Sequence, residues 1–400
     1  MIGRGAGKCA TVTGEHNTFL GTYAGKCASG SGGYNNFIGL CAGFNNTTGG
    51  QNNFLGNAAG YCNTTGGDNN FFGYAAGYCN TTGGFNNFFG RDAGFSNTTG
   101  GCNNFFGYLA GRNNTNGSNN NFLGKDAGCS NTTGGCNNFL GYSAGKCNTT
   151  GCNNNFLGNY AGERNTTGNY NILFGASAGR FTTTGSYNNF FGKQAGYSNT
   201  TGSNNNYLGL FAGRCNTTGT NNNFFGAYAG RYNTTGSCNI ALGYNVQLPN
   251  TTGNNQLAIG VNANTWINGD SSFNVGIGTT NPQYKLHVVG DFAATTKSFV
   301  IPHPTKPGLT LRHGNLEGPE NAVYVRGKTT ESVIPLPDYW TGLVDEDSIT
   351  VNLTAKNGKL HSVVDVSNNN VEVECIDGEI DCYFMILGER KDVAKLTTEY

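Results

Sequence analysis

One stretch of the chain reads Asn69-Asn70-Phe71-Phe72-Gly73-Tyr74-Ala75-Ala76-Gly77-Tyr78-Cys79-Asn80-Thr81-Thr82-Gly83. Its pattern returns along most of the sequence. We call the glycine that follows the apolar pair the phase glycine, and we number the other positions of the unit from it. Phase glycines stand 17 residues apart at 39, 56, 73, 90, 107, 124, 141, 158, 175, 192, 209, 226, 243 and 260, and Gly3 and Gly21 carry the pattern with 18-residue steps. A strict period of this kind indicates a repeat architecture.

The length and composition of the unit favour one coil of a β-solenoid. Helical repeats need longer units and avoid glycine in their interiors. A short extended segment can carry the Asn-Asn-Phe part, with glycines supplying corners of positive φ. Coils stacked about 4.8 Å apart would place identical residues in ladders, and some fifteen coils would give a rod on the order of 70 Å. We therefore predict an all-β fold with a β-solenoid of 17-residue coils over residues 1–264.

The composition of the 400 residues excludes several other classes. Charged residues make up 12%, about half of the usual share of roughly 25%. Collagen is excluded because there is no Gly-X-Y period. A hydrophobic share of 36% argues against disorder. No apolar run approaches the ~20 residues of a membrane span, and the first residues lack the apolar region of a secretory signal, so we expect no membrane insertion.

The charge is zero in total but unevenly divided. Residues 1–265 hold twelve Lys/Arg and five Asp/Glu, a net of +7, whereas residues 266–400 hold eleven and eighteen, a net of −7. The twelve basic residues are sparse and regularly separated, unlike a nucleic-acid-binding patch. We expect no nucleic-acid partner.

The repeat dissolves at about residue 265. Residues 265–297 form a connector, and residues 298–400 show β-branched alternation with Pro and Gly breaks, which predicts a small antiparallel β domain. Its last strands should form a hairpin through a type II′ turn at Gly378-Glu379, because the rival turn at Asp377-Gly378 would set two acidic side chains opposite each other. The predicted register pairs Cys375 with Cys382, Val373 with Phe384 and Val371 with Ile386.

Four segments resemble viral fibre proteins. The segment 275–291, Val-Gly-Ile-Gly-Thr-Thr-Asn-Pro-Gln-Tyr-Lys-Leu-His-Val-Val-Gly-Asp, resembles a connector of phage tail fibres. The segments 297–304, 316–327 and 336–340 resemble a C-terminal domain common in such fibres. The Asn/Gly/Cys-rich repeat is similar to tail-fibre-like structural proteins of cyanobacterial myoviruses and, more distantly, to the head repeats of trimeric autotransporter adhesins. Related fibres often continue into a self-cleaving chaperone, but no Ser/Lys dyad can be matched here, so autoproteolysis is not implied.

The recurrent Asn-Thr-Thr triplets allow two interpretations. Each is formally an N-glycosylation acceptor, but Asn and Thr also bond the turning backbone at corners. Their phase follows the fold period, so we predict corners with bare asparagines. Adjacent threonines would point to opposite faces, which argues against an ice-binding ladder, and five acidic residues are too few for calcium loading in every coil. The triplets begin at Asn46, Asn63, Asn80, Asn97, Asn131, Asn148, Asn165, Asn199, Asn216, Asn233 and Asn250.

The 14 cysteines suggest a disulfide framework at first sight. Side chains in one column run parallel, which leaves their Cβ atoms about 4.8 Å apart, beyond the disulfide mean of about 3.8 Å. We predict free buried thiols, and no zinc site because no Cys-x-x-Cys occurs. Six of them share position +6: Cys9, Cys27, Cys62, Cys79, Cys147 and Cys215.

Catalytic and metal sites are not indicated. His303 and His313 with Glu317 and Glu320 could form a metal site, but surface or hydrogen-bonding roles are the simpler interpretation. Nothing arranges a catalytic triad or a carboxylate pair in a recognisable order. We expect no enzyme and no cofactor, which leaves a polysaccharide lyase or glycosidase on a solenoid as the least supported class.

The paired apolar residues predict self-association. Successive strand residues point to opposite faces, so one member of a pair such as Phe71-Phe72 fills the coil and the other faces outward. Stacking would turn the outward members into a stripe of roughly 600 Å², which a parallel homotrimer would cover with closed symmetry.

We therefore interpret the chain as a structural fibre of a virion, with a rigid shaft and a role in host attachment. The first copy starts inside the unit at about Ile2, so we expect either that the chain is the distal part of a longer fibre or that other virion or fibre proteins cover this end. The other partner is expected to be a host-surface glycan or protein, and the location a virion assembled in the host cytoplasm and extracellular after release. The alternative is a cellular trimeric surface adhesin. The sequence identifies no receptor-binding residues.

Overall fold

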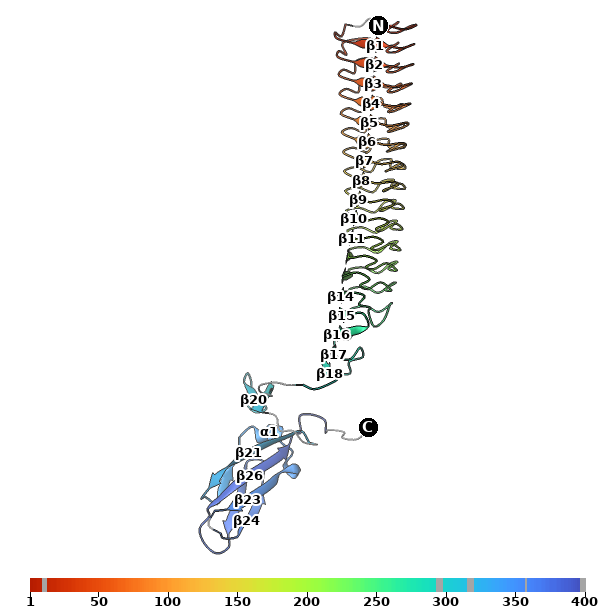
Figure 1. Cartoon of the computed structure of the whole chain (residues 1–400). Coiled ribbons are helices and arrows are strands. Elements are labelled where there is room, and N and C mark those ends of the chain that lie inside the picture. The colour runs from red at the N-terminus through yellow and green to blue at the C-terminus, as the bar shows by residue number, and fades with distance from the viewer. Residues whose placement is uncertain (9–12, 293–297, 315–319, 357, 396–400) are drawn as a thin grey trace. The chain divides into compact units, whose positions relative to one another are not determined.

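The computed structural model describes residues 1–8, 13–292, 298–314, 320–356 and 358–395 (Figure 1). Cys9, Lys297, Glu317 and the other residues of 316–319, which carry sequence predictions, lie outside these ranges. The chain forms two compact units, Met1–Asp291 and Phe292–Tyr400.

The first unit is the predicted β-solenoid, in which each coil contributes one short strand to a continuous parallel ladder (Figure 1). Residues 17 positions apart are paired, as in Phe71 with Phe88. The strands are β1 (Thr18–Leu20), β2 (Asn36–Ile38), β3 (Asn53–Leu55), β4 (Asn70–Phe72), β5 (Asn87–Phe89), β6 (Asn104–Phe106), β7 (Asn121–Leu123), β8 (Asn138–Leu140), β9 (Asn155–Leu157), β10 (Ile172–Phe174), β11 (Asn189–Phe191), β12 (Asn206–Leu208), β13 (Asn223–Phe225) and β14 (Ile240–Leu242).

The interior of the coils is a stack of aromatic rings beside a column of alanines. Phe71 and Phe88 are fully buried, and their ring centroids lie 4.8 Å apart with planes 4° from parallel. The alanine at position +3, such as Ala76, is fully buried beside the ring. Burying one phenylalanine side chain contributes about 1.5–3 kcal/mol. Each ring stacks on the rings of the neighbouring coils, as Phe88 does on Phe71 and Phe105, so the coils stabilise one another.

Two buried asparagine ladders supply the polar bonds of the interior. At position +13, the backbone N–H of Asn86 donates to Oδ1 of Asn69 (2.9 Å), and its amide donates to the carbonyl of Gly100 (2.9 Å). At position +7, Nδ2 of Asn80 donates to Oδ1 of Asn63 (2.7 Å). These bonds satisfy amide groups that would otherwise be costly to bury.

The +7 ladder has one defect. Threonine replaces asparagine at Thr182, and both its hydroxyl and Oδ1 of Asn165 are buried without a hydrogen-bond partner among the described residues. The shorter side chain cannot supply the amide donor and the carbonyl acceptor that the column requires.

The glycines act in two different ways. The phase glycine Gly73 has φ 142°, and the following Gly77 has φ 60°, as predicted for corners. Gly83 does not have a positive φ. A Cβ there would lie 2.4 Å from the carbonyl oxygen of Gly100, so close backbone packing requires this glycine. The repeat also has two corners of left-handed backbone that carry residues other than glycine, such as Ala75 (φ 53°) and Phe85 (φ 59°).

The solenoid unit ends in a change of strand direction. β15 (Leu257–Val261) continues the parallel ladder, whereas β16 (Asn264–Gly269) and β17 (Val275–Ile277) pair antiparallel, and β18 (Leu286–Val288) is parallel to β17. Most of the predicted connector, residues 265–291, is therefore built into the end of this unit.

The second unit consists of small antiparallel sheets around one core, as predicted. A hairpin pairs β19 (Ser298–Pro302) with β20 (Thr310–Gly314). The buried cluster includes Trp340, Val371 and Ile386, from α1 and both three-stranded sheets. One sheet has the order β21 (Ala322–Thr329), β26 (Cys382–Glu389), β23 (Thr350–Ala355), and the other has β22 (Val333–Pro335), β25 (Asn370–Cys375), β24 (His361–Val366); α1 spans Trp340–Leu343 and a 3-10 helix spans Glu346–Ser348.

The predicted final hairpin is wrong. Cys375 lies opposite His361 in β24, and Cys382 lies opposite Thr329 and Ala355. β25 and β26 belong to different sheets, and both turn their apolar sides toward the shared core. The alternation of apolar residues that predicted a hairpin arises because each of the two strands turns one side toward this core.

Candidate functional site: the outward apolar stripe

The outward face of the strands carries a continuous column of large apolar side chains, which we call the apolar stripe. It consists of the second member of each apolar pair, directly before the phase glycine. Phe106, Leu123 and Leu140 are 39%, 40% and 36% exposed. Five other members are half-buried: Leu55, Phe72, Phe89, Leu157 and Phe174. The stripe comprises Leu20, Ile38, Leu55, Phe72, Phe89, Phe106, Leu123, Leu140, Leu157, Phe174, Phe191, Leu208, Phe225 and Leu242.

Stacking keeps the stripe straight and ordered. The ring centroids of Phe72 and Phe89 lie 4.6 Å apart, and those of Phe89 and Phe106 lie 4.8 Å apart. At roughly 50 Å² per coil, a dozen coils expose on the order of 600 Å², the upper end for the largest apolar patch of a monomer. The predicted division of each pair into an inward and an outward member is confirmed.

An asparagine ladder borders the stripe on the same face. Nδ2 of Asn70 donates to Oδ1 of Asn87 (2.8 Å), and the bonds continue from coil to coil. The ladder is interrupted where Ile172 and Ile240 replace asparagine, so the apolar surface widens there. A partner molecule that packs against this face would meet a rigid surface with hydrogen-bond donors, hydrogen-bond acceptors and apolar groups in fixed positions.

The Asn-Thr-Thr triplets form corners. The side chain of Asn80 is fully buried and donates to Gly83 O (2.9 Å) within its own corner. Oγ1 of Thr81 donates to Thr98 O (3.0 Å) in the next coil, whereas Thr82 is exposed. A glycan cannot be attached to an amide that fills the coil interior, and this supports the prediction of bare asparagines. Asn250, in the last triplet, is exposed.

The described cysteines are free thiols, but the prediction that those of the repeat are buried is wrong. Those at position +6 are half-buried because the column lies on the outer side of the turn, and Cys102, Cys136 and Cys238 are exposed. Partial burial still raises the pKa of Cys62, where the neighbouring Cys79 adds to the effect. This disfavours the reactive thiolate form.

The structure brings together only part of the histidine cluster considered from sequence. The rings of His303 and His313 both contact Tyr339, with centroids 6.1 and 5.2 Å away. Nδ1 of His303 accepts a hydrogen bond from the Lys306 backbone (3.0 Å). Glu317 lies outside the described residues. Within the described ranges, no group of three or more His, Cys, Asp or Glu side chains could hold a metal ion.

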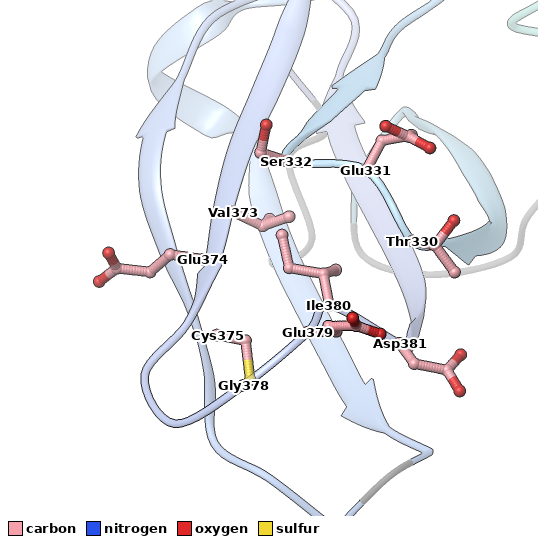
Figure 2. A pocket seen from close by; sticks show the side chains of 10 residues that line it. All are labelled: Thr330, Glu331, Ser332, Val373, Glu374, Cys375, Gly378, Glu379, Ile380 and Asp381. Carbon is pink, nitrogen blue, oxygen red and sulfur yellow. The ribbon is translucent and has the colours of Figure 1, made fainter.

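The second unit has an open hollow of about 760 Å³ at the ends of β22 and β25 (Figure 2). Ile380 and Val373 lie at its centre, while Glu374 and Asp381 point away from it in opposite directions. Burial would raise the pKa of Asp381, but Lys328 and Lys356 outweigh this and lower it. Because Glu374 and Asp381 point in opposite directions, these two side chains do not form a carboxylate pair that could share a substrate.

The arrangement of the basic residues within the coil was not predicted from the sequence. The basic residues of the repeat are not scattered around the coil, because all twelve occur at positions +1, +5 and +6. Their phase relative to the glycine would have revealed this, whereas their number alone suggested a sparse distribution.

Comparison with protein-family models, curated proteins and solved structures finds no match to this chain. In the part of the chain that the structure describes, no helix is long and apolar enough to cross a membrane.

Proposed function

We propose that the chain is a structural fibre whose solenoid associates into a parallel homotrimer through the apolar stripe. The observation that carries this proposal is the continuity of the stripe over β1 to β14. Three copies around one axis would bury three identical stripes together and leave none exposed. The parallel arrangement keeps equivalent coils at equal heights, so the apolar stripe of each copy meets the stripes of the other two coil by coil.

The work of such a fibre is mechanical and adhesive. Stacked rings and amide ladders resist bending because every coil is bonded to the next through several columns. The assignment to a virion rests on the resemblance of residues 275–291 and 336–340 to phage tail fibres. On this basis we propose a shaft that positions host-attachment surfaces, with its place in the virion and outside the cell after release. The proposed role is structural rather than enzymatic.

Charge inserted into the stripe tests the proposal. Leu123→Lys with Leu140→Lys should separate the trimer into single chains, since each copy would bring two charges into an apolar interface. The matched control is Thr133→Lys with Thr150→Lys, in two exposed corners at position +9 of nearby coils. Light scattering after size exclusion measures the mass of each. A control that dissociates equally, or a stripe variant that stays trimeric, would contradict the proposed interface.

A further inference from the structure

The basic residues of the solenoid all lie on the same part of the coil, the turn that follows the phase glycine. Positions +8 to +16 contain no Lys or Arg between the first and last coils. The turns are stacked in register, as shown by the bond from Arg164 N to Arg180 O (3.0 Å). Each coil from Gly90 to Gly226 carries one basic residue in this turn, so the basic columns form one continuous edge there, which we call the basic edge.

The densest part of the basic edge contains four arginines: Arg164, Arg180, Arg214 and Arg231. They occur at positions +5 and +6 of coils between Gly158 and Gly226. With a rise of about 4.8 Å per coil, four guanidinium groups lie within roughly 20 Å along the axis. Positions +5 and +6 are separated from the apolar stripe by the length of the turn, so a trimer formed through the stripe need not bury these arginines.

Aromatic rings hold these guanidinium groups in place. The Cζ atom of Arg164 lies 4.6 Å from the ring centroid of Phe181, and that of Arg214 lies 5.4 Å from Tyr197. The Cζ atom of Arg231 lies beside two rings, 5.5 Å from the centroid of Phe211 and 5.4 Å from that of Tyr228. Stacking on a ring leaves the in-plane N–H donors of arginine available to an anion and limits the entropy lost on binding.

The positive charge of this section is largely unbalanced. Glu163 pairs with Arg180 and is the last acidic residue in the sequence before Asp270. Arg214 donates to the neutral amide of Gln194 (3.0 Å). Nε of Arg231 is shielded from solvent and has no hydrogen-bond partner among the described residues.

We propose that the basic edge binds a linear acidic polysaccharide. This proposal rests on the proposed function and gives the chemical class of the attachment partner. The coil rise is close to the length of one sugar residue in an extended chain, so the carboxylates of neighbouring sugars can meet the arginines of neighbouring coils, such as Arg214 and Arg231. Guanidinium groups bind carboxylates through two parallel hydrogen bonds. Single-stranded nucleic acid is less suited, because it needs free aromatic faces for its bases, and here guanidinium groups cover many of the rings.

Binding of the full chain to immobilised polygalacturonate tests the proposal. The expected result is binding that weakens steeply as NaCl rises from about 0.05 to 0.5 M, with no binding to neutral dextran. Arg214→Gln with Arg231→Gln should weaken the affinity by at least about tenfold. Arg164→Gln, at an exposed position, should weaken it by a few fold without a risk to folding. The matched control, Arg312→Gln with Arg326→Gln in the second unit, should stay within about twofold of the parent.

Three results would overturn the proposal: equal affinity of the Arg→Gln variants and the parent, equal binding to dextran, or tighter binding to poly-dT than to polygalacturonate. Sedimentation of the same samples separates the two proposals. A trimer that does not bind the polymer contradicts only the polysaccharide site, whereas a monomeric parent contradicts the proposed fibre.

Discussion

The two units of this protein find their strand partners in different ways. In the solenoid, Phe71 pairs with Phe88, one repeat away, and the same 17-residue step pairs the strands from β2 to β15. In the second unit, Ala322 pairs with Glu389, and β21 and β23 reach the same central strand β26 from distant parts of the chain. The 17-residue period therefore fixes the strand register of the first unit, whereas a single shared core fixes the strand register of the second.

The same difference governs how each unit responds to damage. Each coil contacts only its neighbours, so the stability of the stack is approximately a sum of coil and interface contributions. The core around Trp340 draws on both sheets at once, so we expect the second unit to unfold as one cooperative piece.

The largest expected effect follows from removing one ring of the interior stack. Phe88→Ala should destabilise the solenoid by about 3–5 kcal/mol, because the fully buried ring contacts Phe71 and Phe105. The transition of the second unit should not move. Differential scanning calorimetry of the full chain measures both transitions.

Phe85→Ala is the control for this substitution, since Phe85 is three residues away and 64% exposed. It should cost less than about 0.5 kcal/mol. Equal losses from the two substitutions would show that the ring stack is not the main source of solenoid stability.

A smaller effect, of opposite sign, is expected at the defect of the +7 ladder. Thr182→Asn should stabilise the solenoid by about 1 kcal/mol, because an amide there can donate to Asn165 and accept from Asn199. Chemical denaturation followed by circular dichroism measures the gain. Thr184→Asn serves as control at an exposed corner position, where Asn116 shows that asparagine is accepted, and a similar gain there would reject the ladder explanation.

The smallest effect concerns pH and the second unit alone. Burial, with the positive charge of Arg390, lowers the pKa of His313. A lowered folded-state pKa gives stability that is present above the unfolded value of about 6.5 and is lost as pH falls through the folded value. The midpoint of the second transition should therefore fall slightly between pH 7 and pH 5, while that of the solenoid changes less.

His313→Phe tests the origin of this pH dependence. Phenylalanine preserves the ring contacts with Phe299 and Tyr339 and cannot bind a proton. The variant should flatten the pH profile of the second transition, and an unchanged profile would assign the effect to other groups.

The sequence predicted the solenoid because its signal is repeated in every coil. The inward and outward members of Phe71-Phe72 and the asparagine corners follow from one unit, and each copy confirms the others. The hairpin at Gly378-Glu379 rested on a single turn, and the competing pairing of Cys375 with His361 depends on a core that no local pattern encodes. The basic edge was visible only once position in the coil, rather than number of charges, was considered.

Sedimentation equilibrium of the purified parent tests directly whether the apolar stripe joins three copies of the chain. We predict one species of three times the 42.1 kDa chain mass over the micromolar range. A stable species of the single-chain mass at those concentrations would contradict the account.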